Sequence, residues 1–236
     1  MKKVLVAVAA VSVMAGATMA FADANIKGSK HDMKAVFNTV GTTTQICVYC
    51  HTPHNAISSM PLWNRNASTQ GTYLLYSSPT MQSSVRQTGF TTDSMSLFCM
   101  SCHDGSPVGG SMVYNNPLKV TTESSAISGN PKANFGVNLT KTHPVNFSLK
   151  TNGNPLGGFN MAGQRRNDGT SDLIWNGTAN YMGLNPNPTF PLFATVDRGS
   201  FAVECSSCHS VHDNFYAPFL RSTMTASALC LGCHRK

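Results

Sequence analysis

Hydrophobic residues in this chain come in short runs, separated by polar residues with strong turn propensity. One longer apolar stretch runs from Val4 to about Ala17, near the amino terminus. Between residues 104 and 204, short apolar or β-branched runs such as 118–122 alternate with turn-forming pairs of Gly, Asn and Pro. This pattern predicts loops with a few short strands in that part of the chain, and no separately folded domain there.

Helical signals are also short. They concentrate around four five-residue segments, and the best candidate for a helix covers 221–231. The predicted fold class is therefore mostly irregular and loop-rich, with short helices at these segments and a few short strands. The four segments lie at 47–51, 99–103, 205–209 and 230–234.

The amino-terminal stretch has the pattern of a secretory signal peptide, and we expect residues 1–24 to be cleaved. Two lysines precede the apolar run, and small residues then offer cleavage after Ala22 or Ala24. The run is too short and too rich in Ala and Gly to favour a retained membrane anchor. No later segment approaches about 18 apolar residues, so we expect no membrane span. The expected destination is the extracellular surface, reached through the periplasm.

All eight cysteines lie in the four segments, and each segment reads Cys-x-x-Cys-His. This is the attachment signature of c-type haem. Two cysteines three apart on a helical turn present both sulfurs on one side, where each adds to a porphyrin vinyl group. The histidine that follows then lies beneath the iron as its proximal ligand. The expected attachment residues are Cys47, Cys50, Cys99, Cys102, Cys205, Cys208, Cys230 and Cys233, and the expected proximal ligands are His51, His103, His209 and His234.

Two Cys₄ zinc sites or four disulfides would also use four such cysteine pairs. Neither requires a histidine after every pair, whereas haem attachment does. We therefore expect four covalent c-type haems in one domain, 25–236. Export fits this chemistry, because thiols must meet haem outside the reducing cytosol. With 212 mature residues (236 minus 24) for four haems, the haems must form much of the apolar core.

The formal charge of +7 suggests an acidic partner, but haem changes the balance. If cleavage leaves Asp23 in place, loss of the two leader lysines gives 15 basic and 10 acidic residues, or +5, and eight propionates would add −8, giving about −3. No local cluster of Lys and Arg supports nucleic-acid binding, which we do not expect. Charged residues make up 11% of the chain, well below the usual value of about 25%, so self-association meets little electrostatic resistance.

The chain carries an internal di-haem repeat, at approximately 31–103 and 143–234. Each half reads His, then Cys-x-x-Cys-His-x-x-His, then Cys-x-x-Cys-His. In both halves a proline, apolar residues and an arginine follow the first motif, at 61–65 and at 218–221. Duplication is the simplest account of this arrangement.

Four histidines remain after the proximal ligands, which is one for each haem. If each of these histidines binds one iron, all four irons have bis-histidine ligation. The alternative is that a methionine replaces one of the four histidines as a ligand. These candidate distal ligands are His31, His54, His143 and His212. Following the repeat, we assign them in that order to the first, second, third and fourth haem.

His54 and His212 each lie three residues after a proximal histidine, which places them on the same face of a helical turn if the helix continues. Because the proximal ring already occupies that side of its own haem, the later ring must serve a different haem. Each His-x-x-His then ties two porphyrins together. His31 lies near the mature amino terminus, so it either serves a haem of its own chain or crosses to a neighbouring subunit.

Three features together resemble the extracellular multihaem cytochromes of metal-reducing bacteria, and the filament-forming tetrahaem members most of all. They are Cys-x-x-Cys-His-Thr-Pro-His-Asn at 47–55, Thr-His-Pro-Val at 142–145 and Leu-Cys-Leu-Gly-Cys-His at 229–234. The likeness covers the haem motifs, roughly a third of the mature chain. It implies little regular structure wrapped around a continuous chain of haems, and subunits stacked end to end into a conductive filament. In that family an amino-terminal histidine can ligate a haem of the adjacent subunit, a role open to His31.

Iron held by two imidazoles has no open position for a substrate, so we expect an electron carrier and not an enzyme. Its partners would be copies of itself, other redox proteins and extracellular acceptors. Ligation by histidine without methionine lowers reduction potentials, which suits anaerobic respiration. Two alternatives stay open: a monomeric periplasmic tetrahaem shuttle, and a multihaem reductase in which one haem keeps an open position.

Overall fold

The computed structural model describes most of the motif regions and part of the stretch between them. The described residues are 26–33, 45–56, 62–66, 71–79, 89–92, 94–106, 127, 132–148, 150–151, 154–155, 173–176, 181–184, 190–195 and 200–234. The expected signal peptide and the run at 118–122 lie outside them. Among the described residues, no helix is long and apolar enough to cross a membrane.

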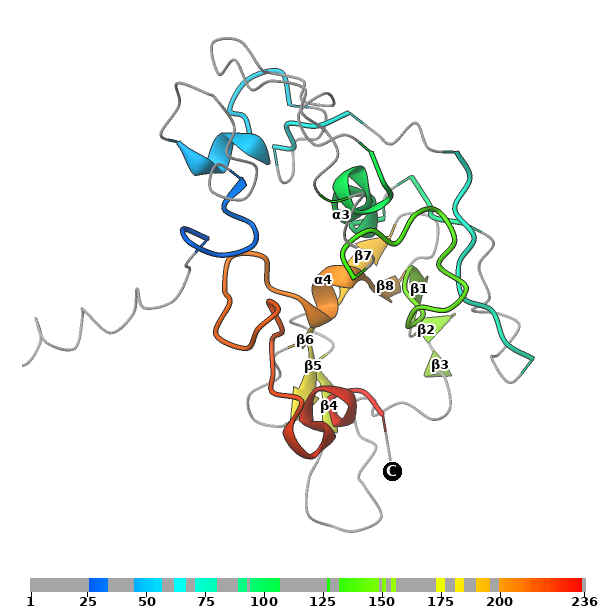
Figure 1. The fold of residues 1–236 in the computed structure, drawn as a ribbon. Coiled ribbons are helices and arrows are strands. Elements are labelled where there is room, and N and C mark those ends of the chain that lie inside the picture. The colour runs from blue at the N-terminus through cyan, green and yellow to red at the C-terminus, as the bar shows by residue number, and fades with distance from the viewer. Residues whose placement is uncertain are drawn as a thin grey trace, which may run out of the picture.

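The helices of the described residues are short, and they lie at the Cys-x-x-Cys-His motifs (Figure 1). They are the 3-10 helix η2 (Ile46–Tyr49), α3 (Ser96–His103), α4 (Cys205–Cys208), and the 3-10 helix η4 (Thr225–Ser227) followed by α5 (Ala228–Leu231). The single helix predicted over 221–231 is therefore wrong in its extent. Ala226 and Ser227 have φ values of 51° and 60°, in the left-handed region, and this interrupts the helix before α5.

The strands lie between the second and third motifs and form three small antiparallel sheets. Their orders are β1-β8-β7, β2-β3 and β4-β5-β6. The strands are β1 (Phe147–Ser148), β2 (Lys150–Thr151), β3 (Asn154–Pro155), β4 (Leu173–Asn176), β5 (Tyr181–Leu184), β6 (Phe190–Pro191), β7 (Phe193–Thr195) and β8 (Ser200–Val203).

Two of these sheets pack against haem motifs. In the first, Phe147 of β1 pairs with Val203 of β8, and β8 leads through Glu204 directly into α4. In the third, Phe190 of β6 lies so close to Gly232 of the fourth motif that a Cβ atom at Gly232 would be 2.0 Å from the ring. The strands therefore position the third and fourth motifs.

Buried apolar side chains form two small clusters, and both involve haem motifs. One contains Met100 of the second motif, and the other contains Tyr49 of the first, against which Cys50 and Cys102 pack. The buried members are Tyr73, Leu75, Met100 and Leu139 in the larger cluster, and Met33 and Tyr49 in the smaller. The role of Met100 agrees with packing and not with iron ligation.

Candidate haem-binding sites

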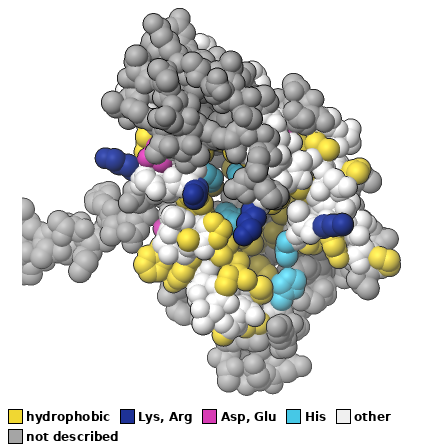
Figure 2. Space-filling view, in the orientation of Figure 1, with side chains coloured by type: hydrophobic (Ala, Val, Ile, Leu, Met, Phe, Trp, Pro, Cys, Tyr) yellow, Lys and Arg dark blue, Asp and Glu magenta, His cyan; other side chains and the backbone are white. Residues whose placement is uncertain are grey.

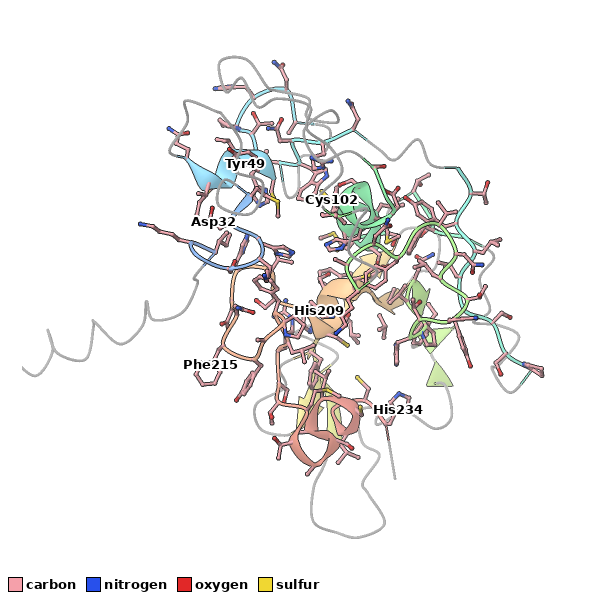
Figure 3. The ribbon with its side chains drawn as sticks, viewed as in Figure 1. Asp32, Tyr49, Cys102, His209, Phe215 and His234 are labelled. Atoms are coloured by element: carbon pink, nitrogen blue, oxygen red, sulfur yellow. The ribbon has the colours of Figure 1, made fainter. Side chains whose placement is uncertain are left out.

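The four motifs lie in sequence order through the molecule. Figure 3 labels one residue from each motif, and they run from Tyr49 at the top, through Cys102 and His209, to His234 at the lower right. All eight cysteines lie in the described ranges, and none forms a disulfide. Within the described residues, no group of three or more His, Cys, Asp or Glu side chains is arranged to hold a metal ion.

Thiols of consecutive motifs are electrostatic neighbours. Burial raises the pKa of Cys50 to about 12, and Cys102 of the second motif adds to the effect. Burial likewise raises the pKa of Cys233 to about 12, with a contribution from Cys208 of the third motif. Before haem attachment, these thiols are therefore protonated at neutral pH.

The second and third motifs are joined by a direct thiol contact. Cys99 donates a hydrogen bond to Cys205, and this bond together with burial raises the pKa of Cys99. The same bond lowers the pKa of Cys205. Thiol interactions thus link each motif to the next along the chain, through a hydrogen bond between the second and third motifs and through electrostatic proximity at the other two steps.

The histidine rings form three close pairs, and each pair joins a proximal histidine to a candidate distal one. The ring centroids are 6.2 Å apart for His31 and His103 and 6.0 Å apart for His51 and His212. They are 6.1 Å apart for His143 and His234. Figure 2 shows histidine side chains running from the middle of the visible face towards its lower right, among hydrophobic side chains.

This separation fits two ligands of one iron. An imidazole nitrogen binds a transition-metal ion at about 2 Å, and the ring centroid lies about 1 Å further away, so two rings on opposite sides of one iron have centroids about 6 Å apart. Iron held by each pair would thus keep both rings close to where the structure places them.

The three pairs differ from the assignment that followed the repeat. His31 lies beside the proximal histidine of the second motif and not the first. His212 lies beside that of the first motif and not the fourth, and His143 beside that of the fourth and not the third. His31 and His143 each lie beside the second proximal histidine of their own half and not the first, and only the His51–His212 pair joins the two halves. His212 thus lies beside the proximal histidine of another motif, although α4 ends at Cys208 and His209 is extended, so the helical turn assumed for His-x-x-His is not present there.

His209 and His54 are the two histidines outside these pairs. By count they are the fourth pair, but no contact between their rings is found in the part of the chain that the structure describes. His54 lies on an exposed loop, whereas burial lowers the pKa of His209. His209 is therefore neutral at pH 7, the form in which it can bind iron.

Backbone carbonyls orient several of these rings. Nδ1 of His103 lies 2.6 Å from the carbonyl oxygen of Ala133, and Nδ1 of His209 lies 3.1 Å from that of Pro218. His143 makes the same contact with the carbonyl of its neighbour Pro144, at 2.8 Å. A ring that donates Nδ1–H to a carbonyl keeps Nε2 free to bind metal, and this contact is usual for ligating histidines.

His31 is held in the same chain by aromatic stacking. Its ring lies 4.2 Å from that of Phe219 at an interplanar angle of 13°. Burial lowers the pKa of His31 to about 4, and the neighbouring His103 adds to this shift. The imidazole is therefore neutral and free of competing protonation at pH 7.

The loop after the first motif folds back onto it. The N–H of Thr52 donates to the carbonyl of Leu62, and the N–H of Asn64 donates to that of Cys50, both at 2.9 Å. Leu62 has a φ of 60°, which is rare for a large side chain.

The loop after the third motif repeats this arrangement. The N–H of Ser210 donates to Phe219 at 2.7 Å, and the N–H of Arg221 donates to Cys208 at 2.9 Å. Phe219 has a φ of 59°, matching Leu62 in the first loop. The two loops therefore share a backbone design, which supports duplication. These hydrogen bonds make Arg221 the equivalent of Asn64 in the first loop. The sequence repeat instead aligns Arg221 with Arg65, one residue further along.

Comparison with known proteins identifies the carboxy-terminal region. Residues 199–236 match the family model described as the doubled CXXCH motif. This is a c-type haem-binding segment. It contains the third and fourth motifs, so the expectation of covalent haem is supported there, and it is the kind of segment that suggests a multihaem c-type cytochrome. No curated protein sequence matches the chain.

The sequence analysis missed two buried charges beside the haem-binding motifs. Arg65 is 1% exposed, and its guanidinium donates a hydrogen bond to the carbonyl of Ser101 in the second motif at 3.0 Å. Glu204 is also 1% exposed and comes directly before Cys205. Two features of the sequence could have indicated these residues. Charged residues are rare in this chain, so one beside a motif stands out, and Ser207 lies three residues after Glu204, the spacing of a capping box.

Proposed function

We propose that this protein is an electron carrier with four covalent c-type haems, each held between two histidines. The observation that carries the proposal is the set of three histidine pairs with ring centroids 6.0 to 6.2 Å apart, the separation of two ligands on one iron. Bound haem supplies reversible one-electron chemistry at iron. The chain's own residues then hold the rings, keep them neutral and exclude water.

The proposal extends to a continuous path for electrons. The hydrogen bond between Cys99 and Cys205, with the electrostatic proximity of Cys50 to Cys102 and of Cys208 to Cys230, supports haem sites that follow one another in sequence order. Electrons would then pass through the subunit from the first motif to the fourth. Saturated irons at each step favour transfer over reaction with a substrate.

We further propose that the subunit is exported and assembles into an extracellular conductive filament. The support is the resemblance of its motifs to filament-forming cytochromes, the signal-peptide pattern and the charge-poor composition. Exposed apolar side chains near the third motif fit self-association, since Phe215 is 68% exposed. His31 lies beside His103 of its own chain. The proposed filament therefore does not require His31 to ligate a haem of the neighbouring subunit.

Three measurements on secreted protein test the electron-carrier and filament proposals separately. Intact mass should show four covalent haems, and electron paramagnetic resonance should show low-spin iron throughout. Fewer haems, or a majority of high-spin iron, would contradict the electron-carrier proposal. Electron microscopy should show filaments, whereas discrete particles at every concentration would leave the protein as a monomeric shuttle.

A second candidate is a multihaem reductase with an open haem at the third motif. It is favoured by one observation: the ring of His209 makes no contact with another histidine ring in the described part of the chain, whereas the other three motif histidines do. Carbon monoxide separates the candidates. One equivalent bound per reduced chain would support a reductase, and none would support four saturated irons.

A further inference from the structure

Glu204 lies at the junction of the second and third motifs and is almost completely buried, at 1% exposure. It is the N-cap residue of α4 and comes directly before Cys205. A carboxylate is rarely buried to this extent unless it is paired or hydrogen-bonded. Neither haem attachment nor iron ligation explains why one is placed here.

The carboxylate accepts hydrogen bonds from both helices at this junction. Its Oε2 accepts from the hydroxyl of Ser94 at 2.8 Å, and from the N–H of Ser96 at 3.3 Å as well as from the Ser96 hydroxyl. On the α4 side it accepts the backbone N–H of Ser207, whose hydroxyl accepts the Glu204 N–H at 3.0 Å. One side chain thus joins the amino-terminal ends of α3 and α4.

The surrounding groups are arranged as donors. The Ser96 hydroxyl oxygen accepts the N–H of Cys205 at 3.0 Å, so its own hydrogen is free to point at Glu204. Backbone N–H groups and hydroxyls that converge on a carboxylate stabilise its charged form. The junction therefore holds a buried negative charge.

That charge acts on attachment cysteines of two different motifs. The pKa of Cys99 is raised by its hydrogen bond to Cys205 and by burial, and Glu204 adds a smaller upward effect. Although the pKa of Cys205 is lowered by the same hydrogen bond, Glu204 opposes the change. Both sulfurs, one in each motif, lie within the field of the Glu204 carboxylate.

We propose that Glu204 is a positioning residue for electron transfer between the second and third haem sites, and that its charge lowers the reduction potentials of these two haems. The inference rests on the four-haem function proposed above. A nearby negative charge stabilises oxidised iron, which carries one more positive charge than reduced iron. The clamp between α3 and α4 also fixes how far apart the two attachment sites lie.

Redox titration of the complete haem-loaded protein tests the inference. Glu204→Gln keeps the size of the side chain and removes its charge. At a fixed ambient potential, the ratio of reduced to oxidised iron should rise about tenfold at two of the four haems, which is a shift of about 59 mV for a one-electron centre. Glu204→Asp retains the charge and should reverse most of this shift.

The shifted pair is identified by removing the first haem with Cys47→Ser and Cys50→Ser, or the fourth with Cys230→Ser and Cys233→Ser; both shifts should persist in each case. Unchanged potentials in a Glu204→Gln protein that has loaded four low-spin haems would overturn the inference. If the Glu204→Gln protein does not bind its haems, Ser94→Ala is used instead, because it keeps the Glu204 charge and removes one hydrogen-bond donor to it. The reduction potentials of the same two haems should then fall. Unchanged potentials in Ser94→Ala would also overturn the inference. Failure of the four-haem function itself appears earlier, in the unaltered protein, as missing haems or high-spin iron.

Discussion

His51 and His212 face each other with ring centroids 6.0 Å apart, although they come from opposite halves of the internal repeat. His51 closes the first motif, and His212 lies three residues after the histidine that closes the third. This ring pair joins one half of the repeat to the other, whereas the other two ring pairs lie within single halves. If His51 and His212 bind one iron, as proposed, the second half completes a haem site of the first.

Replacement of His212 by alanine should open the haem of the first motif. We expect one high-spin iron per chain and one equivalent of carbon monoxide bound after reduction, because the remaining axial ligand leaves one position free. Electron paramagnetic resonance and carbon monoxide titration measure the two effects.

The identity of the opened haem follows from a second set of variants. When Cys47→Ser and Cys50→Ser remove the first haem, the high-spin iron produced by His212→Ala should disappear. When Cys230→Ser and Cys233→Ser remove the fourth haem, it should persist. The reverse result would show that His212 serves the fourth haem, as the repeat alone suggested.

Arg65 should contribute more to stability than its counterpart near the third motif. Its guanidinium satisfies the carbonyl of Ser101 in the last turn of α3, where carbonyls lack helical partners, and it is fully buried. Arg65→Met leaves that carbonyl unpaired and should lower the free energy of unfolding by about 1–3 kcal/mol.

The matched control is Arg221→Met. Nε of Arg221 donates to the carbonyl of Ser206 in α4 at 2.9 Å, but the side chain is only half-buried, so water can replace it. Its loss should lower the free energy of unfolding by less than the loss of Arg65, in denaturant titrations of the haem-loaded protein. Equal effects would argue against burial as the source of the difference.

Gly232 should tolerate no side chain while Phe190 is present. A Cβ atom at Gly232 would lie 2.0 Å from a ring carbon of Phe190, which is 4% exposed. Gly232→Ala should therefore lower the free energy of unfolding by about 1–3 kcal/mol through overpacking. In the background of Phe190→Ala the same substitution should have little effect, and a double-mutant cycle measures the coupling. Additive effects would show that the two residues do not meet in the folded protein.

Haem attachment was predictable from sequence because it is local. Two cysteines and a histidine within five residues are sufficient to bind one porphyrin, and the match over residues 199–236 supports this for two motifs. The short helical turns at the motifs follow from the same spacing.

The three histidine ring pairs were not predictable, because each is a contact between distant parts of the chain. Nothing in the residues around His31 indicates that its ring will stack on Phe219 and face His103. The helix expected over 221–231 failed for a local reason, since residues with good helix propensity adopt left-handed backbone angles at Ala226 and Ser227. Glu204 escaped notice because its partners Ser94 and Ser96 lie more than a hundred residues away.

The most direct test of the account is an experimental structure of the haem-loaded, secreted protein in which the axial ligands of each iron are read individually. We predict His212 opposite His51 on the first haem, His31 opposite His103 on the second, and His143 opposite His234 on the fourth. A structure in which these irons carry the histidines of the repeat-based order, or keep an open position, would contradict it.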